Sequence, residues 1–178
     1  NIADAQHANG AVPTTAPEYV VFEGPGMDAF AESPEWGCTF VVLPFMYYET
    51  YGDDSLIRKY YNGMRRYIDY MTTRANDGIV SFGLGDWYDY GDFRAGFSRN
   101  TPVPLVATAH YYMVVRYLVE AARMLDNRYD VAYYTHLGEE INKAFHREFY
   151  HKDTRQYGTG SQCSNALPLF LGMVPAED

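Results

Sequence analysis

The chain has 178 residues, enough for one domain with a substantial core. Its 23 acidic residues outnumber 14 basic ones and give a formal net charge of −9, which disfavours partners such as nucleic acid or an anionic membrane surface. No apolar run approaches the ~20 residues that membrane insertion of a helix requires.

Aromatic residues make up 17% of the chain and include 18 tyrosines. Such a share fits thick helix packing and fits equally a cleft that contacts sugars or polyphenols. Composition alone leaves both interpretations open.

The first part of the chain is expected to hold the end of a helix and a long connection. Residues 1–9 are predicted to be helical and to stop at Asn9-Gly10, a pair typical of a helix C-terminus. Residues 11–32 are rich in proline, glycine and acids, and a connection of that length is usually functional or disordered.

Three later segments are apolar on nearly every side, which predicts helices that are buried all round. They start near residues 34, 102 and 162. A Ser or Thr that can cap a helix stands at the start of each segment. In the first two segments a proline follows it at the first helical position. The first segment runs to about Tyr51, and Pro44 is expected to bend it.

Two other segments, about 54–75 and 128–150, carry apolar residues on one face only and are predicted to be amphipathic helices. Buried and amphipathic helices therefore alternate, with a repeat of roughly 60–70 residues. This alternation predicts an all-α fold with inner helices covered by outer ones. An α/α toroid and an α-solenoid both satisfy it.

Residues 83–90 read GLGDWYDY and form a loop before the second buried helix. Carbohydrate sites need this mixture, because flat aromatic faces stack on sugar C–H groups and carboxylates accept hydrogen bonds from hydroxyls. Asp86 and Asp89 are therefore candidates for binding sugar hydroxyls. The alternative is that they cap the loop.

The two tryptophans, Trp36 and Trp87, both precede or open a buried helix, so we expect them at one end of the bundle. They could be two walls of one sugar pocket or ordinary packing aromatics. Asp86, Asp89 and Asp92 do not have the spacing of a calcium loop. No Gly-rich phosphate loop, serine nucleophile elbow or zinc helix occurs either, so we expect neither a metal nor a cofactor.

Several short motifs occur in the order found in one enzyme family. They are Pro34-Glu35-Trp36-Gly37, Leu43-Pro44-Phe45, Tyr51-Gly52-Asp53, Gly85-Asp86-Trp87, Thr101-Pro102 with Ala107-Thr108-Ala109, and Tyr157-Gly158-Thr159-Gly160-Ser161-Gln162. Through this ordered set the chain resembles, over essentially its whole length, bacterial α-L-rhamnosidases of glycoside hydrolase family seventy-eight.

The resemblance implies an (α/α)6 barrel, of which residues 1–178 would be the central portion of a single catalytic domain. The rest of the barrel and accessory β domains are expected outside this chain. It also implies inverting hydrolysis of terminal α-L-rhamnosyl residues from oligosaccharides, polysaccharides or glycosides. The family's general acid and base fall before residue 1 and after residue 178, so this segment alone is expected to be inactive. A periplasmic or extracellular location is favoured by the resemblance only.

The resemblance assigns Trp36 and Trp87 as aromatic walls of a rhamnose subsite, with Asp86 as a neighbouring polar contact. Tyr88 and Asp89 complete the candidate substrate-binding set. The sequence leaves two alternatives. One is another α/α-toroid carbohydrate enzyme, either a different glycosidase or a polysaccharide lyase, and the other is a helical binding module without chemistry.

Overall fold

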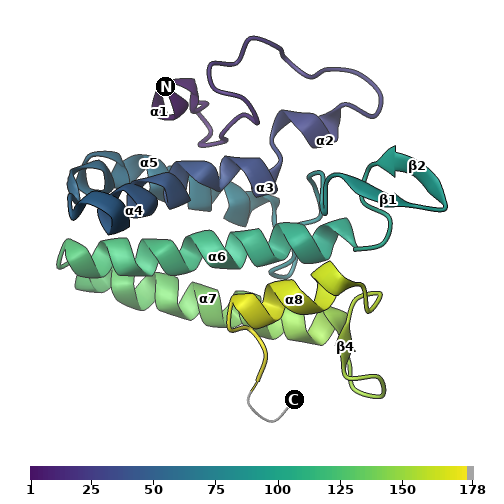
Figure 1. Ribbon diagram of the computed structural model, residues 1–178. Coiled ribbons are helices and arrows are strands. Elements are labelled where there is room, and N and C mark those ends of the chain that lie inside the picture. Colours follow the sequence, from purple (N-terminus) through teal and green to yellow (C-terminus); the bar gives the residue numbers. More distant parts are fainter. Residues whose placement is uncertain (176–178) are drawn as a thin grey trace.

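The computed structural model describes residues 1–175 and is predominantly helical (Figure 1). Its elements in chain order are α1 (Ile2–Ala5), α2 (Asp28–Ala31), α3 (Pro34–Gly37), α4 (Thr39–Tyr51), α5 (Ser55–Arg74), β1 (Asp89–Gly91), β2 (Phe93–Gly96), α6 (Val103–Met124), α7 (Arg128–Phe149), β3 (Tyr150–His151), β4 (Gln156–Tyr157) and α8 (Gln162–Phe170). Within the described residues, no helix is both long enough and apolar enough to cross a membrane.

The helices form two layers around α6. This central helix contacts α3, α4 and α8, which lie along one layer, and also α5 and α7, which cover them from outside (Figure 1). Each outer helix follows an inner one in the chain, so α4–α5 and α6–α7 are helical hairpins. The predicted alternation of inner and outer helices is thereby confirmed.

Local sequence signals explain where the helices begin and end. Gly52 adopts a left-handed φ of 69° and ends α4. The Asn127 side chain accepts a hydrogen bond from the Asp130 backbone N–H and caps α7. The Ser161 hydroxyl accepts in the same way from the Ser164 N–H and caps α8. These caps fix the points at which the outer and inner helices turn.

The core is built around α6, as the sequence predicts for a helix that is apolar nearly all round. Leu105, Val115 and Leu118 are completely buried, and they pack in one apolar cluster with Ile57 and Ile68 of α5. A helix that has neighbours on both sides within its layer and a further layer behind it can bury every apolar position.

In the described residues, α4 and α8 are buried only in part, as expected for inner helices in a portion of a larger barrel. Met46 and Tyr51 of α4 are 55% and 70% exposed, and Leu169 and Phe170 of α8 are 65% and 81% exposed. The reason is position, because α4 and α8 lie at the two edges of the layer and each packs against α6 on one side only.

The N-terminal region also differs from expectation. The first helix ends at Ala5 and not at residue 9, and the chain then turns at Gly10, whose φ is +96°. A Cβ atom at Gly10 would lie 2.2 Å from the Arg66 carbonyl oxygen, so only glycine fits there. The connection over residues 11–32 contains the short helix α2 and is otherwise irregular.

Other features lie beyond the predicted helices. The first inner segment is divided at Cys38 into α3 and α4, and two short antiparallel hairpins, β1–β2 and β3–β4, precede α6 and α8. Figure 1 shows the N-terminal ends of α3, α6 and α8 at the same end of the molecule, beside the β1–β2 hairpin. That end therefore gathers the loops on which a site can be built.

Candidate functional site

An open cavity of about 750 Å³ lies at the end of the molecule where α6 and α8 begin. Three segments far apart in the sequence line it: the 83–90 loop, the residues before α6, and the start of α8. Its lining is Asp86, Asp89, Tyr90, Asn100, Thr101, Thr159, Gly160, Ser161, Gln162, Cys163 and Ala166. Carboxylate, amide and hydroxyl groups dominate this list, so the cavity is suited to a polar ligand rich in hydroxyls.

Asp86 is tied to the helix starts by a chain of hydroxyl groups. Thr101, which is 1% exposed, donates from Oγ1 to Asp86 Oδ2 at 3.2 Å. The hydroxyl oxygens of Thr101 and Ser161 are 2.7 Å apart, and those of Ser161 and Ser164 are 2.8 Å apart. The Asp86 side chain remains only half-buried. Its carboxylate therefore keeps a fixed direction while part of it stays open to the cavity.

Asp89 has a different environment, although it also borders the cavity. It is 7% exposed and accepts hydrogen bonds from the backbone N–H groups of Asn100 and Arg99, both at 2.6 Å. The Tyr90 N–H and the Asn100 side-chain amide donate to its second oxygen. The Asn100 and Arg99 N–H groups, together with these other donors, hold the pKa of Asp89 below its usual range. The geometry favours the loop-capping alternative for Asp89, and its contact with substrate stays a prediction.

Cys163 on α8 lies beside Asp86. Burial, followed by the negative charge of Asp86, raises the pKa of the Cys163 thiol to about 11. The thiol is therefore protonated near neutral pH and forms a neutral part of the wall. Among residues 1–175, no group of three or more His, Cys, Asp or Glu side chains is arranged to hold a metal ion.

Trp87 belongs to an aromatic cluster on the 83–90 loop. Its ring meets Phe30, Tyr88 and Phe97 edge to face, with centroid distances of 5.3, 5.2 and 5.5 Å. Trp87 itself stays half-buried, and Tyr88 is 61% exposed. Trp87 is therefore a packing aromatic that also keeps part of its ring surface accessible to a ligand.

Trp36, on α3, is 37% exposed. The residue before it, Glu35, accepts a hydrogen bond from the Gly85 N–H at 3.1 Å, so the segments that carry the two tryptophans are in direct contact. Neither tryptophan lines the cavity around Asp86. Their predicted role as walls of a sugar pocket stays a prediction.

The structure adds site residues that sequence reasoning did not single out. Thr101 and Ser161 were assigned no binding role from the sequence, yet both line the cavity and hold the Asp86 network. Asn100 and Thr159 join them, because the Thr159 hydroxyl donates to the Asn100 carbonyl. The sequence feature that could have identified them is that Thr101, Thr159 and Ser161 belong to the ordered family motifs.

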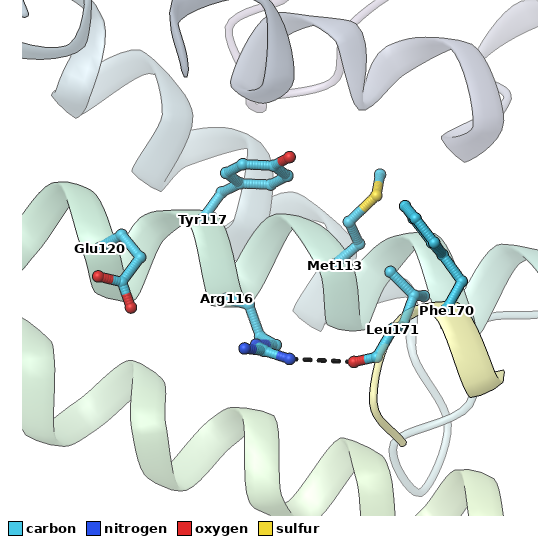
Figure 2. A pocket seen from close by; sticks show the side chains of 6 residues that line it. All are labelled: Met113, Arg116, Tyr117, Glu120, Phe170 and Leu171. Atoms are coloured by element: carbon cyan, nitrogen blue, oxygen red, sulfur yellow. Dashed lines mark hydrogen bonds between the residues drawn. The ribbon is translucent and has the colours of Figure 1, made fainter. Parts of the chain in front are cut away.

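A second cavity, of about 250 Å³, lies farther along α6 where α8 ends (Figure 2). Arg116 donates there to the Leu171 carbonyl oxygen at 3.0 Å. Met113 and Phe170 give the cavity an apolar border, and Glu120 is the one carboxylate among the described residues that line it. This cavity lies at the uncovered edge of the helical layer and away from the motif-bearing loops, so the cavity around Asp86 is the candidate site.

Comparison with known proteins agrees with this architecture. All of residues 1–178 match the family described as bacterial alpha-L-rhamnosidase 6 hairpin glycosidase domain. An alpha-L-rhamnosidase from Formosa agariphila is 29% identical over 153 residues, covering 81% of this chain and 16% of the relative. Another from Streptomyces avermitilis is 28% identical over 177 residues, covering 98% of this chain and 15% of the relative.

Solved structures give the same result. The alpha-L-rhamnosidase from Dictyoglumus thermophilum superposes with a TM-score of 0.84 and 28% identity, covering 99% of this chain and 19% of that one. The Streptomyces avermitilis alpha-L-rhamnosidase complexed with L-rhamnose has a TM-score of 0.82 and 25% identity, covering 99% and 16%. The chain thus spans less than a fifth of the length of the curated relatives it matches, at 16%, 19% and 15%.

Proposed function

Because this chain belongs to the bacterial alpha-L-rhamnosidase 6 hairpin glycosidase family, we propose that the protein containing it is a glycoside hydrolase that removes terminal α-L-rhamnosyl residues. The observation that carries the proposal is the cavity where α6 and α8 begin, since it joins a directed carboxylate, Asp86, to hydroxyl groups and lies on the loop that bears Trp87. The substrates would be rhamnose-containing oligosaccharides, polysaccharides or glycosides.

Residues 1–178 would form the central portion of a single (α/α)6 catalytic domain. The apolar edges of the layer support this assignment, because Met46 of α4 and Phe170 of α8 are 55% and 81% exposed. The cavity between α6 and the end of α8 lies at one of these edges (Figure 2). Further helices of a closed barrel would cover such surfaces and bury them.

The reaction would proceed with inversion at the anomeric carbon. A general acid would protonate the leaving oxygen and a general base would activate water on the opposite face of the ring, with their carboxyl groups ~6.5–9.5 Å apart. Both groups are expected outside this chain. The described residues would then bind and orient the sugar, which is a contribution to catalysis through position.

Within the cavity, each group has a distinct part in holding the sugar. The Asp86 carboxylate accepts a hydrogen bond from a sugar hydroxyl, and such charge-assisted bonds are strong and directional. Thr101 keeps that carboxylate in place through its 3.2 Å bond. The start of α8 carries the positive end of the helix dipole, which attracts sugar oxygens, although its Ser164 N–H is already capped by the Ser161 hydroxyl.

The aromatic walls would account for preference among sugars. Rhamnose carries a methyl group where mannose carries a hydroxymethyl, and an apolar face such as that of Trp87 or Trp36 favours the methyl. The two sugars differ there by one hydroxyl. Burying that hydroxyl against an apolar face without a hydrogen-bond partner costs about 1–3 kcal/mol, on the order of 5- to 150-fold in preference.

The test is a comparison of aryl glycosides with the full-length protein. We expect kcat/KM for an aryl α-L-rhamnoside to exceed that for the matched aryl α-L-mannoside, which differs only by the 6-hydroxyl, by about 10-fold or more. Proton NMR should show the β anomer of rhamnose as the first product. Preferential cleavage of another glycoside would favour a different α/α-toroid enzyme, and sugar binding without cleavage would favour a binding module.

A further inference from the structure

The carboxylate of Glu35 joins two segments that are about fifty residues apart in the chain. Its Oε1 accepts from the Gly85 N–H at 3.1 Å, and its Oε2 accepts from the Leu84 N–H at 3.4 Å. The Ser33 hydroxyl also donates to Oε2, and Ser33 Oγ accepts from the same Leu84 N–H at 3.1 Å. Glu35 thus holds the Gly85 N–H by itself and shares the Leu84 N–H with Ser33, whose hydroxyl oxygen is the nearer acceptor.

The surroundings show that this contact is closely fitted. Ser33 and Leu84 are 0% and 1% exposed, so water cannot readily replace the lost partners of their polar groups. A Cβ atom at Gly83 would lie 2.7 Å from Glu35 Oε2 and 2.7 Å from Pro34 Cδ. The loop backbone therefore approaches α3 at a position where only glycine leaves room for the carboxylate.

The contact joins the two short segments that carry the tryptophans. Trp36 directly follows Glu35, and Trp87 comes two residues after Gly85. Asp86, with its bond to Thr101, lies between Gly85 and Trp87, so the same loop backbone also carries the polar side of the cavity. Any shift of residues 84–85 away from α3 would change the spacing of the two indole rings and the direction of the Asp86 carboxylate.

We propose that Glu35 is a positioning residue of the rhamnosyl site, which fixes Trp87 and Asp86 relative to Trp36 by accepting the Leu84 and Gly85 N–H groups. This inference rests on the proposed function. Glu35 acts through the loop and does not itself contact substrate. Its negative charge suits the task, because a hydrogen bond to a carboxylate is stronger than one between neutral groups.

The first test measures selectivity, since the ratio of two kcat/KM values does not depend on how much of the enzyme is folded. In the full-length protein, Glu35→Ala should lower the preference for an aryl α-L-rhamnoside over the aryl α-L-mannoside by roughly 3- to 10-fold, because the indole face no longer meets the methyl group. Glu35→Gln keeps one acceptor oxygen and should lose less.

A double-mutant cycle with Trp87→Ala distinguishes an effect of Glu35 on the position of Trp87 from a general loss of folded structure. If Glu35 acts through Trp87, Glu35→Ala should leave the selectivity of the Trp87→Ala protein unchanged. Asp53→Ala is the matched control, because Asp53 also accepts a backbone N–H, that of Ser55 at 2.9 Å, but does so at the start of α5. We expect it to leave the selectivity at the wild-type value.

Backbone amide exchange without substrate gives a readout that does not depend on activity. Glu35→Ala should speed exchange at Leu84 and Gly85, and unchanged exchange there would contradict the inference whatever the activity. An active wild-type protein whose selectivity survives Glu35→Ala would also overturn the inference alone. A wild-type protein that cleaves neither glycoside would contradict the proposed function and, with it, the positioning role.

Discussion

Replacing Trp87 with alanine in the full-length protein is expected to lower kcat/KM on an aryl α-L-rhamnoside by about 1–3 kcal/mol, on the order of 5- to 150-fold. The reason is the loss of an apolar face against which the sugar ring and its methyl group are buried. The ring is half-buried on a loop beside the cavity, so part of its surface is open to a ligand.

The control for this prediction is Phe97→Ala. Phe97 also contacts Trp87 edge to face at 5.5 Å, so its removal loosens the same aromatic cluster and leaves the indole present. We expect a smaller fall in kcat/KM for Phe97→Ala than for Trp87→Ala. An unchanged kcat/KM in Trp87→Ala would contradict the assignment of Trp87 as a wall of the subsite.

Replacing Phe145 with alanine is expected to destabilise the domain by about 3–5 kcal/mol, which is the usual cost of removing a fully buried aromatic ring. Phe145 lies on α7 with 0% exposure, and its ring centroid is 5.0 Å from that of Phe149 and 5.7 Å from that of Tyr157. Tyr157 precedes the turn that leads to α8, so the change should also loosen that side of the cavity.

Urea unfolding of the full-length protein, followed by the circular dichroism of its helices, measures this effect. Tyr129→Ala is the matched control, because Tyr129 lies on the same helix but is 77% exposed. A substitution at such a position should change stability by less than about 0.5 kcal/mol. Equal destabilisation by the two variants would show that Phe145 does not anchor the core.

The long helices could be predicted from the sequence because their signals are local. In α5 and α7 one apolar stripe repeats at helical spacing, and the Gly52 turn and the Ser161 cap are set by residues beside them. Local signals do not show where each apolar helix lies in the layer. Composition shows that Met46 and Phe170 prefer burial, but it does not show which neighbours are there to cover them.

The site could be predicted only in part from the sequence, because its residues come from distant segments that folding brings together. The sequence identified the 83–90 loop, but it gave Asp86 and Asp89 the same role. Only the structure separates them, since Asp89 is occupied by the N–H groups of Arg99 and Asn100. The contacts of Glu35 could not be predicted from the sequence either, because its partners Leu84 and Gly85 lie some fifty residues away.

The central claim is that the cavity at the start of α6 and α8 holds the rhamnosyl group. A crystal structure of the full-length protein with L-rhamnose tests it most directly. We expect a sugar hydroxyl on Asp86 in this cavity and the ring extending from it toward the 83–90 loop. An indole face of Trp87 or Trp36, which lie outside the cavity lining, should then meet the apolar side of the ring. L-rhamnose bound elsewhere, with no contact to Asp86 or to either tryptophan, would contradict the claim.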